Sequence, residues 1–138
     1  MRWLKFVPVA TLAGAGLVIG DARAYEPSMN YTLHCMGCHT PDGSAVADRV
    51  PAIRTTLLPF ARMAEGRKFL VQVPGAAQSA LSNAELAPLL NWMIENLGDG
   101  AQAPAFTRYT ESEVAGYRPH ALIEVRATRE RLLAQVNR

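Results

Sequence analysis

Cysteine is scarce in this 138-residue chain, which contains only Cys35 and Cys38. A disulfide between them would close a loop of four residues and remove little entropy from the unfolded chain. A structural zinc ion needs four protein ligands. Beyond Cys35, Cys38 and His39 only His34 and His120 could contribute, and the adjacent Cys38 and His39 would chelate awkwardly. A thioredoxin-like motif needs a surrounding βαβ pattern, and no convincing strand pattern flanks the cysteines. All three roles are therefore poorly supported.

Long hydrophobic segments are also missing. The apolar run at residues 6–19 is shorter than the ~20 residues that a membrane-spanning helix needs. Basic residues precede this run, and the sequence "ARA" at 22–24 follows it as a cleavage site. This combination is typical of a secretory signal peptide. We therefore predict that residues 1–24 are a signal peptide, that the mature protein is periplasmic or otherwise exported, and that it has no membrane span after cleavage.

The mature chain also lacks an excess of either charge. The full sequence has 14 basic and 12 acidic residues, of which three basic and one acidic lie in residues 1–24, so eleven of each remain. Nucleic-acid binding needs a concentrated basic face, which this composition does not supply. The length and the apolar content fit one compact domain rather than a disordered chain or a repeat array. We expect no nucleic-acid partner.

The two cysteines belong to a Cys-x-x-Cys-His motif at residues 35–39, which is the attachment signature of c-type haem. On a short helical segment the two thiols reach the two vinyl groups along one edge of the porphyrin, and the next residue places its imidazole under the iron. Covalent attachment holds the cofactor even where a small protein cannot bury it fully. We therefore expect one covalent haem c, attached at Cys35 and Cys38, with His39 as the proximal iron ligand.

Further features surround this motif in a particular order. Tyr31 lies four residues before the first cysteine, Gly43 follows in the pattern Cys-His-x-x-x-Gly, and "RVPAIR" places Pro51 downstream. With the haem motif, these features resemble the small class I cytochrome c family over about residues 25–97. In that family a proline carbonyl accepts the Nδ1 proton of the iron-bound histidine. The resemblance therefore implies a hydrogen bond from His39 to the carbonyl of Pro51.

Helix signals lie at both ends of this region. Pro27 suits the first turn of a helix that leads to the haem motif. Ser82 and Glu85 form a capping box, and apolar residues then recur at helical spacing over 86–97. This segment is similar to the family's carboxy-terminal helix. The similarity implies that Trp92 packs on the amino-terminal helix.

The region between these two helices has a less regular pattern. Residues 55–75 indicate one or two short helices, broken at Pro59 and near Gly66 and ending before Pro74. The segment "FLVQV" has the composition of a strand, but a haem domain of this size more often uses such a segment as a buried helix. We therefore expect an all-α, cytochrome c-like domain around one covalently bound haem.

An extension follows the haem domain, which we place at residues 25–100. Residues 101–138 begin as a small linker, and Thr110 and Glu113 form a second candidate capping box. We expect an additional amphipathic helix over 119–138, with its apolar residues facing inward and its arginines outward. This helix has two interpretations, as a strap that folds back on the core or as a docking element for a partner.

The sixth iron ligand is the point at which the sequence departs from its family. Class I cytochromes usually present a methionine from the loop before the carboxy-terminal helix, but residues 71–82 contain none. Met93 follows Trp92 at a position that lines the haem pocket in the family, so we rank Met93 first as the distal ligand and Met63 second. The alternative is that both are flexible core residues and that the iron is five-coordinate or binds water.

The expected function follows from the cofactor. We predict an electron carrier rather than an enzyme, which passes single electrons between redox protein partners such as a periplasmic dehydrogenase or a terminal oxidase. One alternative is an open-iron haem protein that reduces peroxide or binds a gas. Another is a haem subunit held within a larger dehydrogenase complex.

Overall fold

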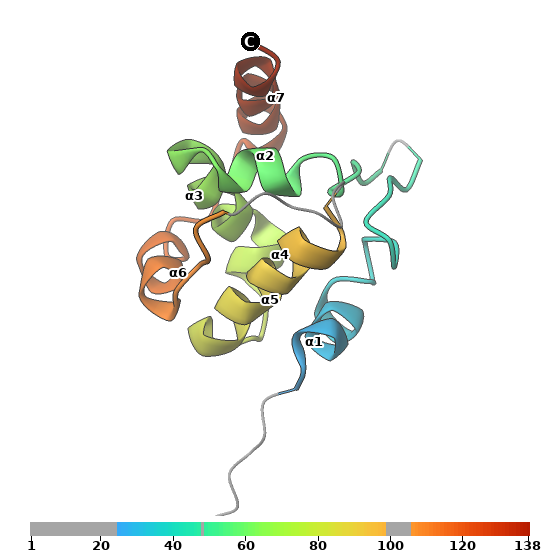
Figure 1. Cartoon of the computed structure of the whole chain (residues 1–138), viewed down its shortest axis with the longest axis vertical. Helices are drawn as coiled ribbons and strands as arrows, with labels where there is room; N and C mark the ends of the chain where they lie inside the picture. The colour runs from blue at the N-terminus through green and yellow to red at the C-terminus, as the bar shows by residue number, and fades with distance from the viewer. Residues whose placement is uncertain (1–24, 48, 99–105) are drawn as a thin grey trace, which may run out of the picture.

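The computed structural model describes residues 25–47, 49–98 and 106–138. The predicted signal peptide and the start of the predicted linker, residues 101–105, lie outside the described residues. Figure 1 shows the helices α1 (Pro27–His34), α2 (Leu57–Ala61), α3 (Ala64–Gln72), α4 (Pro74–Ala77), α5 (Asn83–Asn96), α6 (Glu111–Tyr117) and α7 (Val125–Val136). Over these residues the only β pairing is an isolated bridge between Val46 and Val50. The predicted all-α class is confirmed for this part of the chain.

Helix α5 runs through the middle of the molecule, with α1 on one side and α6 on the other (Figure 1). Its start is the predicted capping box: the Ser82 side chain accepts from the Glu85 N–H, and the Glu85 carboxylate accepts from the Ser82 N–H. Its apolar stripe forms much of the core, with the residues Leu86, Leu89, Leu90, Met93 and Ile94 all buried. Burying a side chain of this size stabilises the fold by about 1.5–3 kcal/mol, so α5 organises the core.

Helix α1 packs across α5. Pro27 occupies its first turn as predicted, where a missing N–H leaves no helical hydrogen bond unmade. The rings of Tyr31 and Trp92 lie 5.6 Å apart between centroids and are tilted by 44°. The predicted contact of Trp92 with the amino-terminal helix is therefore confirmed.

The predicted break at Pro59 is wrong. Pro59 lies in the first turn of α2, where the backbone N–H groups have no partner within the helix. The chain instead turns at Met63, which adopts an extended conformation before α3. Gly66 lies inside α3, where a Cβ atom would approach the Phe60 carbonyl oxygen to 2.3 Å. Gly66 therefore permits the close approach of α2 and α3.

The predicted helix over residues 119–138 begins later than expected. Helix α7 starts at Val125, because the preceding chain runs past the end of α3, where the Leu122 N–H donates to the Gln72 carbonyl at 2.8 Å. Leu132 is buried, but Val136 is 38% exposed. The inward stripe is therefore only partly realised.

Polar contacts join the segment from residue 106 onward to the core. Asn91 donates to the Tyr109 carbonyl at 3.0 Å and accepts from the Tyr109 N–H at 2.7 Å. Arg67 binds both carboxylate oxygens of Glu113, at 2.7 and 2.6 Å. The Thr110 side chain caps α6 by accepting from the Glu113 N–H, whereas the Glu113 carboxylate binds Arg67 instead of completing a capping box. These contacts favour the strap interpretation.

Candidate functional site

Residues 35–39 form a helical turn directly after α1. The Cys35 N–H donates to the Tyr31 carbonyl at 2.9 Å, and the N–H groups of Cys38 and His39 donate to the Cys35 carbonyl at 3.1 and 2.9 Å. Side chains three and four positions apart share one face of a helical turn. The local fold therefore places Cys38 and His39 beside Cys35.

Tyr31 holds this turn against the core. Its side chain is 2% exposed, and its hydroxyl donates to the Thr40 carbonyl at 2.6 Å, just after the motif. Burial, with smaller contributions from Cys35 and Asp42, raises the pKa of Tyr31 to about 12. The hydroxyl therefore stays protonated and remains a hydrogen-bond donor at neutral pH.

Gly43 brings a second loop to the motif. It adopts a φ of 71°, a left-handed conformation that glycine tolerates without strain. Its carbonyl accepts from the N–H groups of Ile53 and Arg54 at 2.9 and 3.1 Å. Pro51 and Ile53, on this second loop, line the same cavity as the Cys-x-x-Cys-His motif.

A cavity of about 310 Å³ lies between the motif and the core helices. Ligand sites in proteins typically measure about 300–1,000 Å³, whereas packed interiors contain few voids larger than a water molecule. Cys35, Cys38, His39, Pro51 and Met93 all line it. Most of the remaining wall is apolar and includes Leu57, Phe69, Leu70, Leu81, Leu86, Leu89 and Leu90. The predicted attachment motif therefore faces an apolar space of ligand size.

His39 is neutral in this environment, because burial lowers the pKa of its imidazole below the ordinary value of 6.5. A neutral ring has a lone pair available for a metal. Its Nδ1 is buried and has no hydrogen-bond partner among the described residues. Pro51 lines the same cavity, but the predicted hydrogen bond from His39 Nδ1 to the Pro51 carbonyl is not formed in this structure.

Both cysteines are free thiols, with Cys38 exposed and Cys35 partly buried. Burial, followed by the charge of Cys38, raises the pKa of the Cys35 thiol to about 11. Two thiols and a neutral imidazole on one wall of an apolar cavity are the donor set that a covalently attached haem requires. Among the described residues, no group of three or more His, Cys, Asp or Glu side chains could hold a metal ion by itself.

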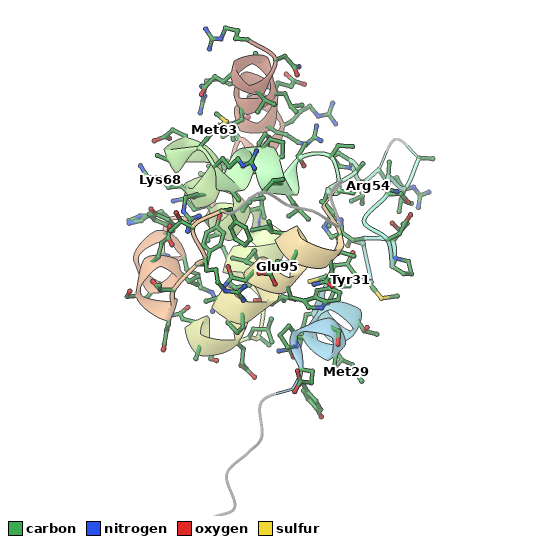
Figure 2. All side chains as sticks on the ribbon, viewed as in Figure 1. Met29, Tyr31, Arg54, Met63, Lys68 and Glu95 are labelled. Carbon is green, nitrogen blue, oxygen red and sulfur yellow. The ribbon has the colours of Figure 1, made fainter. Side chains whose placement is uncertain are left out.

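The two candidate distal methionines lie in different places. Met93 lies on α5, is 8% exposed and lines the same cavity as the motif. Met63 precedes α3 and does not line the cavity. In Figure 2, Met63 lies in the upper part of the view, away from Tyr31 of α1. The structure therefore brings Met93, but not Met63, together with the predicted haem ligands.

The cavity residues that sequence reasoning missed include Val125 and Arg129 of α7. The expectation that the arginines of this helix all point outward is wrong for Arg129, which is partly buried against the cavity. Val125, Arg129 and Leu132 follow one another at helical spacing, so the apolar stripe itself marked Arg129 as an inward position. His34 also contributes to the wall, although its side chain is exposed.

No helix within the described ranges combines the length and the apolar character needed to cross a membrane. Comparison with known proteins adds no assignment: no family model matches the chain, and no curated protein matches it significantly. The function must therefore be argued from the residues around the cavity.

Proposed function

We propose that this protein is an exported monohaem c-type cytochrome that carries single electrons between redox partner proteins. The observation that carries the proposal is the position of the Cys-x-x-Cys-His motif, residues 35–39, on the wall of an apolar cavity of about 310 Å³. The motif predicts covalent haem, and the cavity offers an apolar site of ligand size beside it. The sequence features at residues 1–24 support export.

Each residue of the motif has a defined role in this proposal. The Cys35 and Cys38 thiols would hold the haem by adding across its two vinyl groups, an addition in which each S–H hydrogen would pass to the vinyl group and no oxidant would be consumed. His39 would hold the iron through Nε2, and the lowered pKa of its buried imidazole keeps that nitrogen's lone pair available. The helical turn orients all three side chains before the cofactor arrives, because its hydrogen bonds are local.

The surroundings of Met93 favour electron transfer over chemistry at an open iron. The bound haem supplies a one-electron iron couple, whose potential a methionine ligand raises. Met93 is buried in the cavity wall, and the neighbouring side chains Leu86, Leu89 and Leu90 are apolar. An apolar wall would exclude water from the iron on this side. A thioether ligand from Met93 would leave no open site for peroxide or a gas.

The test compares Met93→Leu with Met63→Leu in the haem-loaded full chain. Leucine keeps most of the methionine volume, so each change costs less than about 1.5 kcal/mol of stability, but it removes the sulfur. We expect the wild-type protein and Met63→Leu to give low-spin reduced spectra that carbon monoxide leaves unchanged. Met93→Leu is expected to become high spin and to bind carbon monoxide.

Two outcomes would contradict this assignment. A wild-type protein that is already high spin when reduced and binds carbon monoxide would favour an open-iron, peroxidase-like or gas-binding protein. A spectral change in Met63→Leu alone would remove Met93 as the distal ligand while leaving the haem in place. Purified protein without any haem absorption would refute the cytochrome proposal itself.

A further inference from the structure

Arg129 is the only arginine on the wall of the 310 Å³ cavity as the structure describes it. It lies on α7, one helical turn after Val125, which lines the same cavity. One terminal nitrogen, Nη2, donates to the Ala52 carbonyl at 3.3 Å. Because Ala52 follows Pro51 in the chain, that contact places the guanidinium beside Pro51, at the edge of the cavity that the loop with Pro51 and Ile53 forms.

The charge of Arg129 is poorly compensated. Its side chain is partly buried, and burial lowers the pKa of its guanidinium. Within the described part of the chain no carboxylate forms an ion pair with Arg129, and the Ala52 carbonyl is its one acceptor. A guanidinium has five N–H donors, and a buried charge is costly unless it is paired and hydrogen-bonded. Most of its donors therefore remain available.

Other partly buried arginines of this chain are well satisfied. Arg67 binds Glu113 through two parallel hydrogen bonds and also donates to two backbone carbonyls. Arg118 donates to the carbonyls of Ala77, Ser79 and Leu81. The contrast indicates that Arg129 has hydrogen-bond donors free for an acceptor that the described residues do not supply.

The surroundings of Arg129 favour an anion. A second hollow, of about 520 Å³, adjoins the cavity and shares Pro51, Val125 and Arg129 with it. Among the residues that the structure describes, its charged lining consists of Arg49, Arg126, Arg129 and Glu130. This described lining carries more positive than negative charge, whereas the interior of the cavity is apolar.

We propose that Arg129 binds a propionate carboxylate of the haem, so that helix α7 completes the cofactor site. This inference rests on the proposed function, because it takes the cavity to hold a haem. The propionates are the anionic groups of that cofactor, and they belong at an electropositive edge while the ring occupies the apolar interior. The carboxy-terminal extension is then a part of the haem site and not only a strap.

The proposed pair has a measurable consequence for the iron. A guanidinium binds a carboxylate in a two-pronged, charge-assisted arrangement, and its positive charge offsets the negative charge of the propionate. A positive charge near the iron favours the reduced form, which carries one positive charge fewer. Loss of Arg129 should therefore lower the reduction potential and weaken the hydrogen bonding of one propionate.

The test uses the haem-loaded full chain with Arg129→Gln, Arg129→Lys and the control Arg126→Gln. Arg126 is exposed on the same helix and lines only the outer hollow. Two readouts are measured: the reduction potential by spectroelectrochemistry, and the propionate bending band by resonance Raman spectroscopy.

We expect Arg129→Gln to raise the oxidised-to-reduced ratio several-fold at a fixed potential, where tenfold corresponds to about 59 mV for one electron. The propionate band should also move to lower frequency. Arg129→Lys keeps the charge, so its reduction potential should stay close to that of the wild-type protein. It lacks the two-pronged geometry, so its propionate band should lie between the bands of Arg129→Gln and the wild-type protein. Arg126→Gln should leave the band unchanged.

Several results would overturn the inference. Equal behaviour of Arg129→Gln and Arg126→Gln would show that Arg129 makes no special contact with the cofactor. A lower potential with an unshifted propionate band would assign Arg129 a purely electrostatic effect, and altered carbon monoxide binding with an unshifted band would place it over the iron. If Arg129→Gln does not fold, the band of Arg129→Lys decides: an unshifted band refutes the pair. Failure of the proposed function is distinct, because the wild-type protein would then carry no covalent haem.

Discussion

Replacement of Asn91 by alanine tests whether the carboxy-terminal segment belongs to the same folding unit as the haem motif. Asn91 is 4% exposed on the central helix α5, and its amide makes two hydrogen bonds to the backbone of Tyr109. Tyr109 is itself 4% exposed. The substitution would leave one N–H and one carbonyl group of Tyr109 buried without these partners.

The expected loss of stability follows from those two groups. A buried donor or acceptor left unsatisfied costs about 1–3 kcal/mol, so the two together should cost about 2–6 kcal/mol if water does not replace Asn91. Small proteins have total unfolding free energies of about 5–15 kcal/mol. The change should therefore be large in a urea titration.

Asn96→Ala is the matched control. Asn96 lies on the same helix, is exposed, and donates only to the Trp92 carbonyl, so its removal should change stability by no more than about 0.5 kcal/mol. We expect Asn91→Ala to lower the urea midpoint with the slope of the transition unchanged, because one cooperative unit still unfolds. A midpoint as high as that of Asn96→Ala would refute the reasoning, and a separate early transition would show that the extension folds independently.

Two further predictions concern close packing and acid stability. Gly66→Ala should lower the free energy of unfolding, measured in urea, by about 1–3 kcal/mol, because the new Cβ would meet the rigid backbone of Phe60. The control Gly116→Ala places its Cβ in open space on α6 and should be neutral or stabilising. Equal effects of the two substitutions would contradict the packing argument. Hydrogen bonds from Ser44, then Thr40, hold the pKa of Asp42 at about 2, below its ordinary 3.8. The stabilisation of the folded state by ionised Asp42 is present above pH 3.8 and is lost as the pH falls towards 2. Asp42→Asn should therefore flatten this part of a profile of unfolding free energy against pH. An unchanged profile would refute the role of Asp42.

Local features of the fold could be predicted from the sequence. The start of α1 at Pro27, the capping box of Ser82 with Glu85 and the helical periodicity of α5 all depend on residues within a few positions of one another. The same holds for residues 35–39, whose spacing alone places three side chains on one face of a helical turn.

Other features depend on contacts between distant residues and were missed or misplaced. Pro59 reads as a helix breaker, yet it fits the first turn of α2, and the turn at Met63 instead lets α2 pack on α3. The sequence predicts that Glu113 completes a capping box with Thr110, but the Glu113 carboxylate binds Arg67, which lies 46 positions away in the chain. Arg129 reads as a solvent-facing charge, because only the folded arrangement shows the cavity beside it. Periodicity describes a helix face but not the partner that covers it.

Covalent attachment of haem at Cys35 and Cys38 is the central claim, and the mass of the purified chain tests it most directly. The full-length gene is expressed together with a c-type haem maturation system, and the denatured product is measured by intact mass spectrometry. We predict that the wild-type chain gains the mass of one haem and keeps haem stain through denaturing electrophoresis. Chain with Cys35→Ala and Cys38→Ala together should have the mass of the polypeptide alone. Wild-type protein without added haem mass, or haem that survives denaturation in the double variant, would contradict the account.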